Sequence, residues 1–252
     1  MNEQLRFADP GEAADLAAFL GRLVHYDRAA AVRLQGTPLA PQAAGGGGGA
    51  LGVFGRPPSF EVLAIRTVRL AVPVAAPLDV TVSAGELLES VDEAAAGATV
   101  PGPVTGPPWT GVLPPRGGWR QLPGLPGTEA IVQAVAASVT EFRARDEALP
   151  AQHRTRSERD RIGREIWSRT LGDTELPLRV AHAAQSLGFL RPVRAAVSAS
   201  ASASAGSASA ASDPVALLAS GSWLRLRTPY GSVATRRPGA TGGLGAFRVS
   251  PR

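Results

Sequence analysis

The predicted fold rests on the segment Trp223-Leu-Arg-Leu-Arg-Thr-Pro-Tyr-Gly-Ser-Val-Ala-Thr-Arg-Arg237. Two stretches of alternating apolar and polar residues flank the turn-forming sequence Thr228-Pro-Tyr-Gly231, a pattern typical of a β-hairpin. Alternation places Leu224 and Leu226 on one face of a strand, which we expect to face the core. The other face of that strand carries Trp223, Arg225 and Arg227, and strands are predicted near 215–219, 223–228 and 232–236.

Helices are predicted before this hairpin and at the start of the chain. Asp9-Pro-Gly-Glu12 and Thr155-Arg-Ser-Glu158 both have the residues of an N-terminal cap, so they predict helices that end near His25 and Arg169. Apolar residues at helical spacing predict two more helices, over 128–146 and 178–187. Short apolar runs at 31–35, 51–54 and 60–70 predict strands of an antiparallel sheet. The fold class predicted from this order is α+β.

The composition along the chain predicts two lobes. An N-terminal lobe of helix plus antiparallel sheet is expected over 1–96, with a flexible insertion at 36–50 that contains five consecutive glycines. A connector rich in proline and glycine follows over 97–127, and a lobe of helices and hairpin spans 128–237. Within that second lobe, residues 195–212 are almost all Ala and Ser and predict a low-complexity insertion, and the tail 238–252 is expected to be disordered.

The charge is unevenly distributed over the 252 residues. The net charge is +5, yet residues 1–115 carry a net −4 and residues 116–252 a net +9. Such asymmetry indicates an acidic partner for the second half, either DNA or an acidic protein surface, or contact between the halves. All 26 basic residues are arginine, and the abundance of Arg, Ala, Gly and Pro is similar to that of proteins from high-GC actinobacteria.

Several function classes are excluded or disfavoured by absent residues. The chain has no cysteine, which excludes disulfides, thiolate catalysis and cysteine-ligated zinc. Its three histidines lie in no metal-binding or hydrolase motif, so we predict no enzyme activity, no metal and no cofactor. No secretory signal and no run of about 18 apolar residues is visible, so a soluble cytoplasmic protein is expected.

One enzyme family resembles the N-terminal part. Leu5-Arg-Phe-Ala-Asp-Pro-Gly-Glu-Ala-Ala-Asp-Leu-Ala-Ala-Phe19, followed by strands, is similar to the opening strand and helix of the GNAT acetyltransferases. That resemblance implies an acyltransferase, but the loop that binds acetyl-CoA pyrophosphate in the family is missing after 60–70, where Val72-Pro-Val74 follows.

The segment 155–237 resembles a winged-helix domain, which implies DNA binding. The resemblance makes 178–187 the recognition helix, with Arg179 and His182 on its free face. The hairpin would then be the wing. Its phosphate contacts would be Arg225, Arg227, Arg236 and Arg237.

A protein-interaction module is the alternative function. Indole rings in a proline- and glycine-rich segment usually pin that segment to a neighbouring surface, so the connector is expected to be an ordered strap. The residues predicted to bind a protein partner are Trp109, Trp119, Trp223 and Tyr230. On helix 155–169, the i,i+4 pairs Asp160–Arg164 and Glu165–Arg169 are expected to neutralise part of the basic charge.

Overall fold

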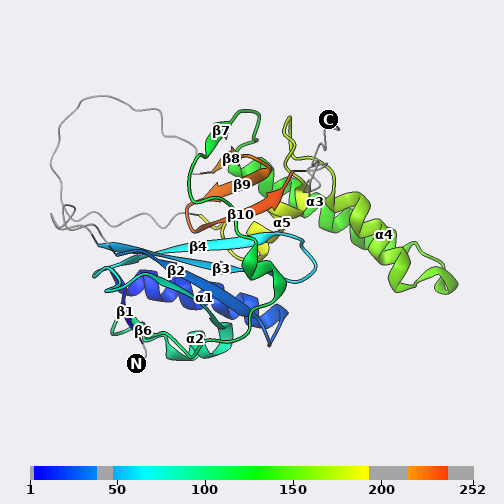
Figure 1. Cartoon of the computed structure of the whole chain (residues 1–252). Helices are drawn as coiled ribbons and strands as arrows, with labels where there is room; N and C mark the ends of the chain where they lie inside the picture. The colour runs from blue at the N-terminus through cyan, green and yellow to red at the C-terminus, as the bar shows by residue number, and fades with distance from the viewer. Residues whose placement is uncertain (1–2, 39–47, 193–214, 238–252) are drawn as a thin grey trace, which may run out of the picture.

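The computed structural model describes residues 3–38, 48–192 and 215–237, and its centre is one large antiparallel sheet (Figure 1). Eight strands lie in the order β5-β2-β3-β4-β10-β9-β8-β7. The predicted α+β class with antiparallel strands is therefore confirmed. The predicted insertion 36–50 lies partly outside the described residues, and the Ala/Ser segment 195–212 and the tail 238–252 lie wholly outside them.

The first helix begins where its capping residues predict, and a second N-terminal helix has a similar cap. The Asp9 side chain accepts a hydrogen bond from the Glu12 N–H at 3.0 Å, and the Ser83 hydroxyl accepts one from the Glu86 N–H at 3.3 Å. β1 and β6 form a separate two-stranded sheet. The elements are β1 (Gln4–Arg6), α1 (Pro10–Tyr26), β2 (Ala31–Gly36), β3 (Gly49–Gly55), β4 (Leu63–Leu70), β5 (Leu78–Ser83), α2 (Ala84–Ser90) and β6 (Gly97–Thr99).

The helices after residue 128 and the strands of residues 216–236 lie close to their predicted bounds, whereas the short strand Arg120–Leu122 lies in the connector, where no strand was predicted. The Thr155 hydroxyl accepts a hydrogen bond from the Glu158 N–H at 3.3 Å, which confirms the predicted cap of the helix that follows. The elements are β7 (Arg120–Leu122), α3 (Thr128–Glu147), α4 (Arg156–Trp167), α5 (Leu178–Ser186), β8 (Ala216–Ser220), β9 (Trp223–Thr228) and β10 (Gly231–Arg236).

The β9–β10 hairpin is an internal part of the large sheet. Besides pairing with each other, β9 pairs with β8 and β10 pairs with β4, where Val233 lies opposite Ala64. The sheet is therefore continuous between the strands of residues 31–83 and those of residues 120–236 (Figure 1). A wing projects from a helical base, whereas this hairpin has a neighbouring strand on each side. The resemblance to a winged helix is accordingly not shown.

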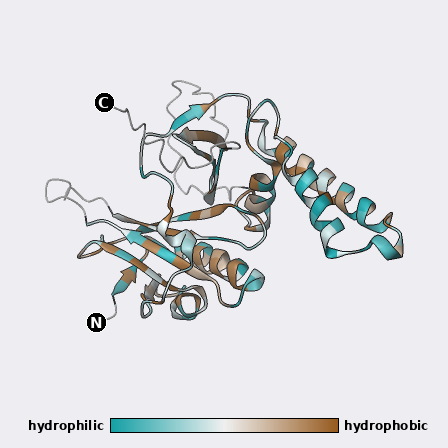
Figure 2. Ribbon diagram, turned by 45° about the vertical axis from the view of Figure 1, so that its right-hand side comes forward, coloured by the Kyte–Doolittle hydropathy of each residue, from teal (hydrophilic) through white to brown (hydrophobic). Residues whose placement is uncertain are grey.

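The two faces of the sheet differ in what covers them. Helices α1 and α5 pack on one face, against β4 and β10, and α3 packs on α5. The main core on this face includes Leu224 and Leu226, as expected from their alternation. Figure 2 shows many hydrophobic residues in α1 and in the strands beside it, while α3 and α4 extend outward and are mainly hydrophilic in colour. The opposite face carries a smaller apolar cluster of Ile65, Trp223 and Ala234.

The connector crosses this second face as an ordered strap. The Val104 N–H donates to the Thr81 carbonyl at 2.9 Å, and the Arg33 guanidinium donates to the Thr110 carbonyl while pairing with Asp79 at 2.7 Å. The segment includes a short 3₁₀ turn, Pro108–Gly111. These contacts hold the strap against β5 and β2.

A buried ion network joins the first helix to the sheet and to the hairpin turn. The Arg66 guanidinium lies 2.8 Å from the Glu12 carboxylate and donates a second bond to the Tyr230 carbonyl at 2.8 Å. The side chains of Arg66 and Glu12 are only 6% and 10% exposed. Arg69 and Asp15 complete the network. Because these residues come from α1, β4 and the β9–β10 turn, the network couples the two parts of the chain.

Candidate nucleic-acid interface

Basic and aromatic side chains gather on the sheet face opposite the main core. On β9, Arg225 and Arg227 point away from the core, opposite Ala234 and Ser232 of β10. Residues directly opposite one another in an antiparallel pair lie on the same face, so these four side chains share one surface. We call this surface the basic sheet face, made of Trp119, Trp223, Arg225, Arg227 and Arg236.

Arg225 and Arg227 carry positive charge without a counter-ion. Arg225 donates to the Ser232 hydroxyl at 2.8 Å, and its guanidinium carbon lies 5.6 Å from the centre of the Trp119 ring. Within the described residues no carboxylate lies within ion-pair distance of either arginine. Burial, followed by the charge of Arg227, lowers the pKa of Arg225. An anion placed beside the pair would relieve this repulsion.

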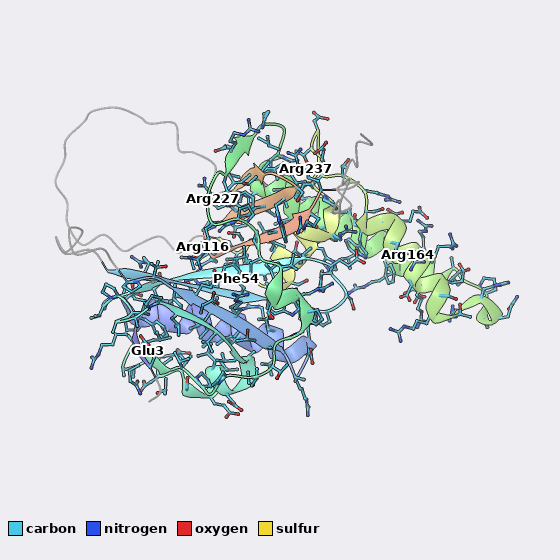
Figure 3. All side chains as sticks on the ribbon, viewed as in Figure 1. Glu3, Phe54, Arg116, Arg164, Arg227 and Arg237 are labelled. Carbon is cyan, nitrogen blue, oxygen red and sulfur yellow. The ribbon has the colours of Figure 1, made fainter. Side chains whose placement is uncertain are left out.

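The other hairpin arginines have different surroundings. The Arg236 guanidinium lies 4.4 Å from the centre of the Trp223 ring and donates to the Ser222 hydroxyl at 2.6 Å, so it belongs to the same face. Arg237 instead lies 3.7 Å from the Glu175 carboxylate. Figure 3 shows Arg227 and Arg237 at separate places on the hairpin. Of the four arginines predicted to contact phosphate, Arg225, Arg227 and Arg236 therefore lie on one face, and Arg237 does not.

An apolar groove adjoins this face where the strap crosses the sheet. It has a volume of about 350 Å³ and lies between Trp109 and Val112 of the strap and Trp223 of β9. Arg56 and Arg236 lie at its rim. Both tryptophans of the connector therefore lie at the basic sheet face. Trp119 forms a cation–π contact with Arg225, and Trp109 lines the groove that adjoins this face.

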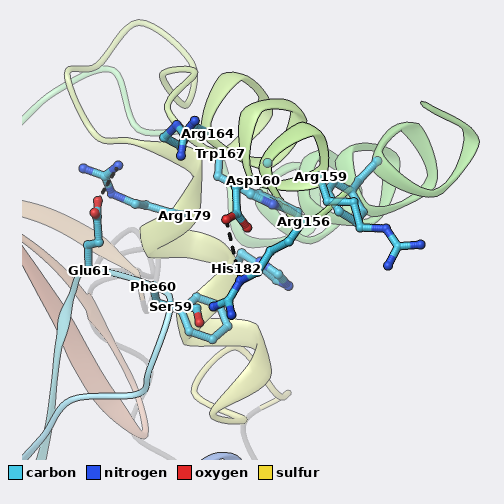
Figure 4. A pocket seen from close by; sticks show the side chains of 12 residues that line it. Ser59, Phe60, Glu61, Arg156, Arg159, Asp160, Arg164, Trp167, Arg179 and His182 are labelled. Carbon is cyan, nitrogen blue, oxygen red and sulfur yellow. Dashed lines mark ion pairs between the residues drawn. The ribbon is translucent and has the colours of Figure 1, made fainter. Parts of the chain in front are cut away.

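The two residues predicted on the recognition helix lie elsewhere. Arg179 and His182 of α5 line a cleft between α4, α5 and the β3–β4 loop, which we call the helix cleft (Figure 4). Arg179 lies 3.3 Å from the Glu61 carboxylate. The His182 ring stacks on Trp167 with 4.1 Å between ring centres, and burial lowers the pKa of His182. Because α5 packs on β10, these side chains are separated from Arg225 and Arg227 by the sheet.

Tyr230, predicted to bind a partner, contacts other parts of this chain. Its hydroxyl donates to the Pro192 carbonyl at 3.1 Å, and the Arg191 guanidinium lies 3.6 Å from the centre of its ring. Sequence reasoning missed Ser232, which anchors Arg225. The hairpin register contained that signal, because Ser232 falls on the same face as the β9 arginines. It also missed Phe60 and Trp167 of the helix cleft, which come from segments about 100 residues apart.

Helices capable of crossing a membrane are not found among the described residues. Neither the curated proteins nor the solved structures contain a match to this chain. Two protein families do match. Residues 1–111 match the domain of unknown function DUF8010, and residues 114–240 match the domain of unknown function DUF8185. The two matches meet within the connector, and because the second covers half of the sequence, the chain belongs to the DUF8185 family.

Proposed function

We propose that this protein is a non-enzymatic regulatory protein that binds single-stranded nucleic acid on the basic sheet face. The observation that carries the proposal is the pair Arg225 and Arg227, two adjacent cations without a carboxylate partner in the described part of the chain, next to the partly exposed ring of Trp119. Phosphates would supply the missing counter-charge, and bases have the flat faces that stack on indole rings.

The position of the hairpin favours a single strand over a duplex. Sequence readout of a duplex needs a helix or ribbon that enters the major groove. Here α5 is packed on β10, and its residues Arg179 and His182 lie in the helix cleft. A sheet face with aromatic and basic side chains suits unpaired bases, which can leave the stack and lie against it. Arg236, held over Trp223, extends the row of cations across β10.

The test is fluorescence anisotropy with a labelled single-stranded 20-mer of DNA and the matching duplex. We expect binding to the single strand at 50 mM salt, weaker binding to the duplex, and a linear fall of log affinity with log salt. The double substitution Arg225→Gln and Arg227→Gln should reduce the slope of that line by about 1.4, because each lost phosphate contact on a single strand removes about 0.7. Trp119→Ala should weaken binding by about 1–3 kcal/mol if one base stacks on this ring.

A matched control removes the same charge elsewhere. Arg120 lies opposite Ala219 of the main core and so points to the other side of the sheet, and Arg143 is exposed on α3. The double substitution Arg120→Gln and Arg143→Gln should leave most of the affinity and the slope intact. Equal losses in both double variants would show non-specific attraction by net charge, and no binding at 50 mM salt would refute the proposal.

A protein-interaction module is the second candidate, favoured by the apolar groove beneath the strap. Val112 at this groove is 52% exposed, and Trp109 and Trp223 form its walls. An acidic segment with one large apolar side chain would match the groove and its arginine rim. Trp109→Ala should then abolish binding of such a partner, while the Arg225 and Arg227 double variant should retain part of it.

The acyltransferase alternative remains a prediction. β4 leads into β5 through residues 71–77 without an intervening helix. The resembling family places its pyrophosphate-binding helix after the corresponding strand. The experiment that tests this alternative is a thermal melt with acetyl-CoA, which should raise the melting temperature if the cofactor binds.

A further inference from the structure

The helix cleft is a second candidate binding site, on the side of the sheet away from the basic sheet face. Its volume is about 490 Å³, within the range of about 300–1,000 Å³ that is usual for small-molecule sites. Aromatic rings line it. The His182 imidazole lies flat against Trp167, and the edge of Phe60 approaches the same imidazole with 5.1 Å between ring centres (Figure 4). A planar ligand would find apolar surface here.

The polar ring atoms of two aromatic residues in the cleft have no hydrogen-bond partner within the described residues. The two ring nitrogens of His182 and the indole nitrogen of Trp167 form no hydrogen bond with any described residue. Burial lowers the pKa of His182, so its neutral imidazole offers one donor and one acceptor at neutral pH. Apolar rings combined with a few unsatisfied polar atoms suit a heteroaromatic ligand that has polar edge groups.

The cleft also holds an uncompensated positive charge. The predicted pair between Asp160 and Arg164 is not formed, because the Asp160 carboxylate lies 3.9 Å from Arg156 instead. Arg164 consequently has no ion pair with any residue of the described ranges. On the facing helix, the Nε of Arg179 is buried without a hydrogen-bond partner. Both guanidinium groups lie at the cleft (Figure 4). Arg179 is paired there with Glu61 at 3.3 Å, so Arg164 supplies the unpaired charge that would stabilise an anionic group between α4 and α5.

Gly163 leaves the cleft open. A Cβ at this position in the middle of α4 would lie 3.7 Å from both Phe142 and Trp167, which is ordinary van der Waals contact. Packing therefore does not require glycine here. Glycine in a helix interior also lowers the stability of the helix by about 1 kcal/mol relative to alanine. The missing side chain exposes the indole edge of Trp167 to the cleft.

The loop that closes the cleft has a strained backbone. Ser59 and Glu61 have φ angles of 68° and 53°, in the left-handed region that residues with a Cβ rarely adopt. These two residues flank Phe60 and hold its ring against His182. Residues with such strained backbones persist only where the surrounding structure holds them in place. They are found more often at ligand sites than elsewhere.

We propose that the helix cleft binds a nucleoside monophosphate, with the base against the rings of Trp167, His182 and Phe60 and the phosphate at Arg164 and Arg179. This ligand has the planar ring, the polar ring edge and the anionic group that the cleft matches. The proposal is independent of nucleic-acid binding on the basic sheet face, because the two sites share none of these residues.

The experiment is isothermal titration calorimetry of the full chain with AMP, GMP, CMP and UMP. At least one should bind with a dissociation constant below 1 mM. The matching nucleoside, which lacks the phosphate, should bind about 10- to 100-fold more weakly, as expected for loss of hydrogen bonds between charged groups. Inorganic phosphate should also bind at least 10-fold more weakly. Absence of heat with all four nucleotides overturns the proposal, and so does equal affinity for the nucleoside or for inorganic phosphate.

Variants locate the site. Gly163→Leu should block the cleft and abolish binding, and Arg164→Gln, which leaves the packing intact, should weaken it by about 10-fold. The matched control is Arg161→Gln on the same helix, whose guanidinium pairs with Glu158 at 2.8 Å and lies outside the cleft. Equal loss in Arg161→Gln and Arg164→Gln would overturn the assignment. The Arg225 and Arg227 double variant should keep full nucleotide affinity, so failure of this proposal and failure of the basic sheet face are distinguishable.

Discussion

Replacing Glu12 by alanine should destabilise the protein strongly, because it leaves a buried arginine without its main counter-ion. The side chains of Glu12 and Arg66 are 10% and 6% exposed, and their charged atoms lie 2.8 Å apart. The remaining carboxylate near Arg66, that of Asp15, is 3.4 Å away and also pairs with Arg191. Breaking a buried pair by removing one partner costs about 3–5 kcal/mol. We expect a loss in this range, which is a large share of the 5–15 kcal/mol typical of folded domains.

Urea denaturation followed by circular dichroism measures this loss. With a slope of about 2–3 kcal/mol per M, the midpoint should fall by roughly 1–2.5 M. The matched control is Arg161→Ala, which breaks the exposed pair with Glu158 and should cost only about 0.3–0.5 kcal/mol. The double variant Glu12→Leu and Arg66→Met should lose much less than the sum of the single changes, since no charge then remains buried. A loss below 1 kcal/mol in Glu12→Ala would refute the reasoning, because the pair would then behave like a solvated surface pair.

Three further predictions concern local packing and acid stability. Gly163→Ala should raise the free energy of unfolding by about 1 kcal/mol in urea titration, because the new methyl group fits at 3.7 Å and alanine favours the helix; a decrease would contradict the packing described for α4. Gly231→Ala should lower it by about 1–3 kcal/mol, because the added Cβ would lie 2.6 Å from the buried ring of Phe189; a neutral result would show that this ring can move. The hydrogen bond from Arg145 lowers the pKa of Glu165 from its ordinary value of 4.5 to about 2, so the stabilisation is complete above pH 4.5 and is lost as the pH falls toward 2. Glu165→Gln should therefore flatten the pH dependence of the urea midpoint between pH 4.5 and 2, and an unchanged profile would contradict this assignment.

Local sequence determined most of the secondary structure of this protein. The caps at Asp9 and Thr155 begin helices as predicted, since the bond from a capping side chain reaches only three residues along the chain. The β9–β10 hairpin was also predicted from local sequence. Its turn residues and the alternation of Leu224 and Leu226 depend on neighbours in the sequence alone.

The tertiary structure decided where the hairpin lies and which charges are free. Pairing of β10 with β4 joins residues about 170 positions apart, and no local pattern specifies such a partner. That pairing turns an expected wing into the middle of a sheet. On the other side of the hairpin, pairing of β7 with β8 and of β8 with β9 brings Trp119 next to Arg225. Ion pairs depend on local spacing and on packing together. The predicted pair between Arg169 and Glu165 forms at 3.5 Å, and packing of α4 on α3 adds Glu141 at 2.6 Å from Arg169. Asp160 pairs with Arg156, also four residues away on α4, so Arg164 is left unpaired in the described part of the chain. Spacing along a helix shows which charges can meet, whereas the folded structure decides which of the possible partners each charge takes.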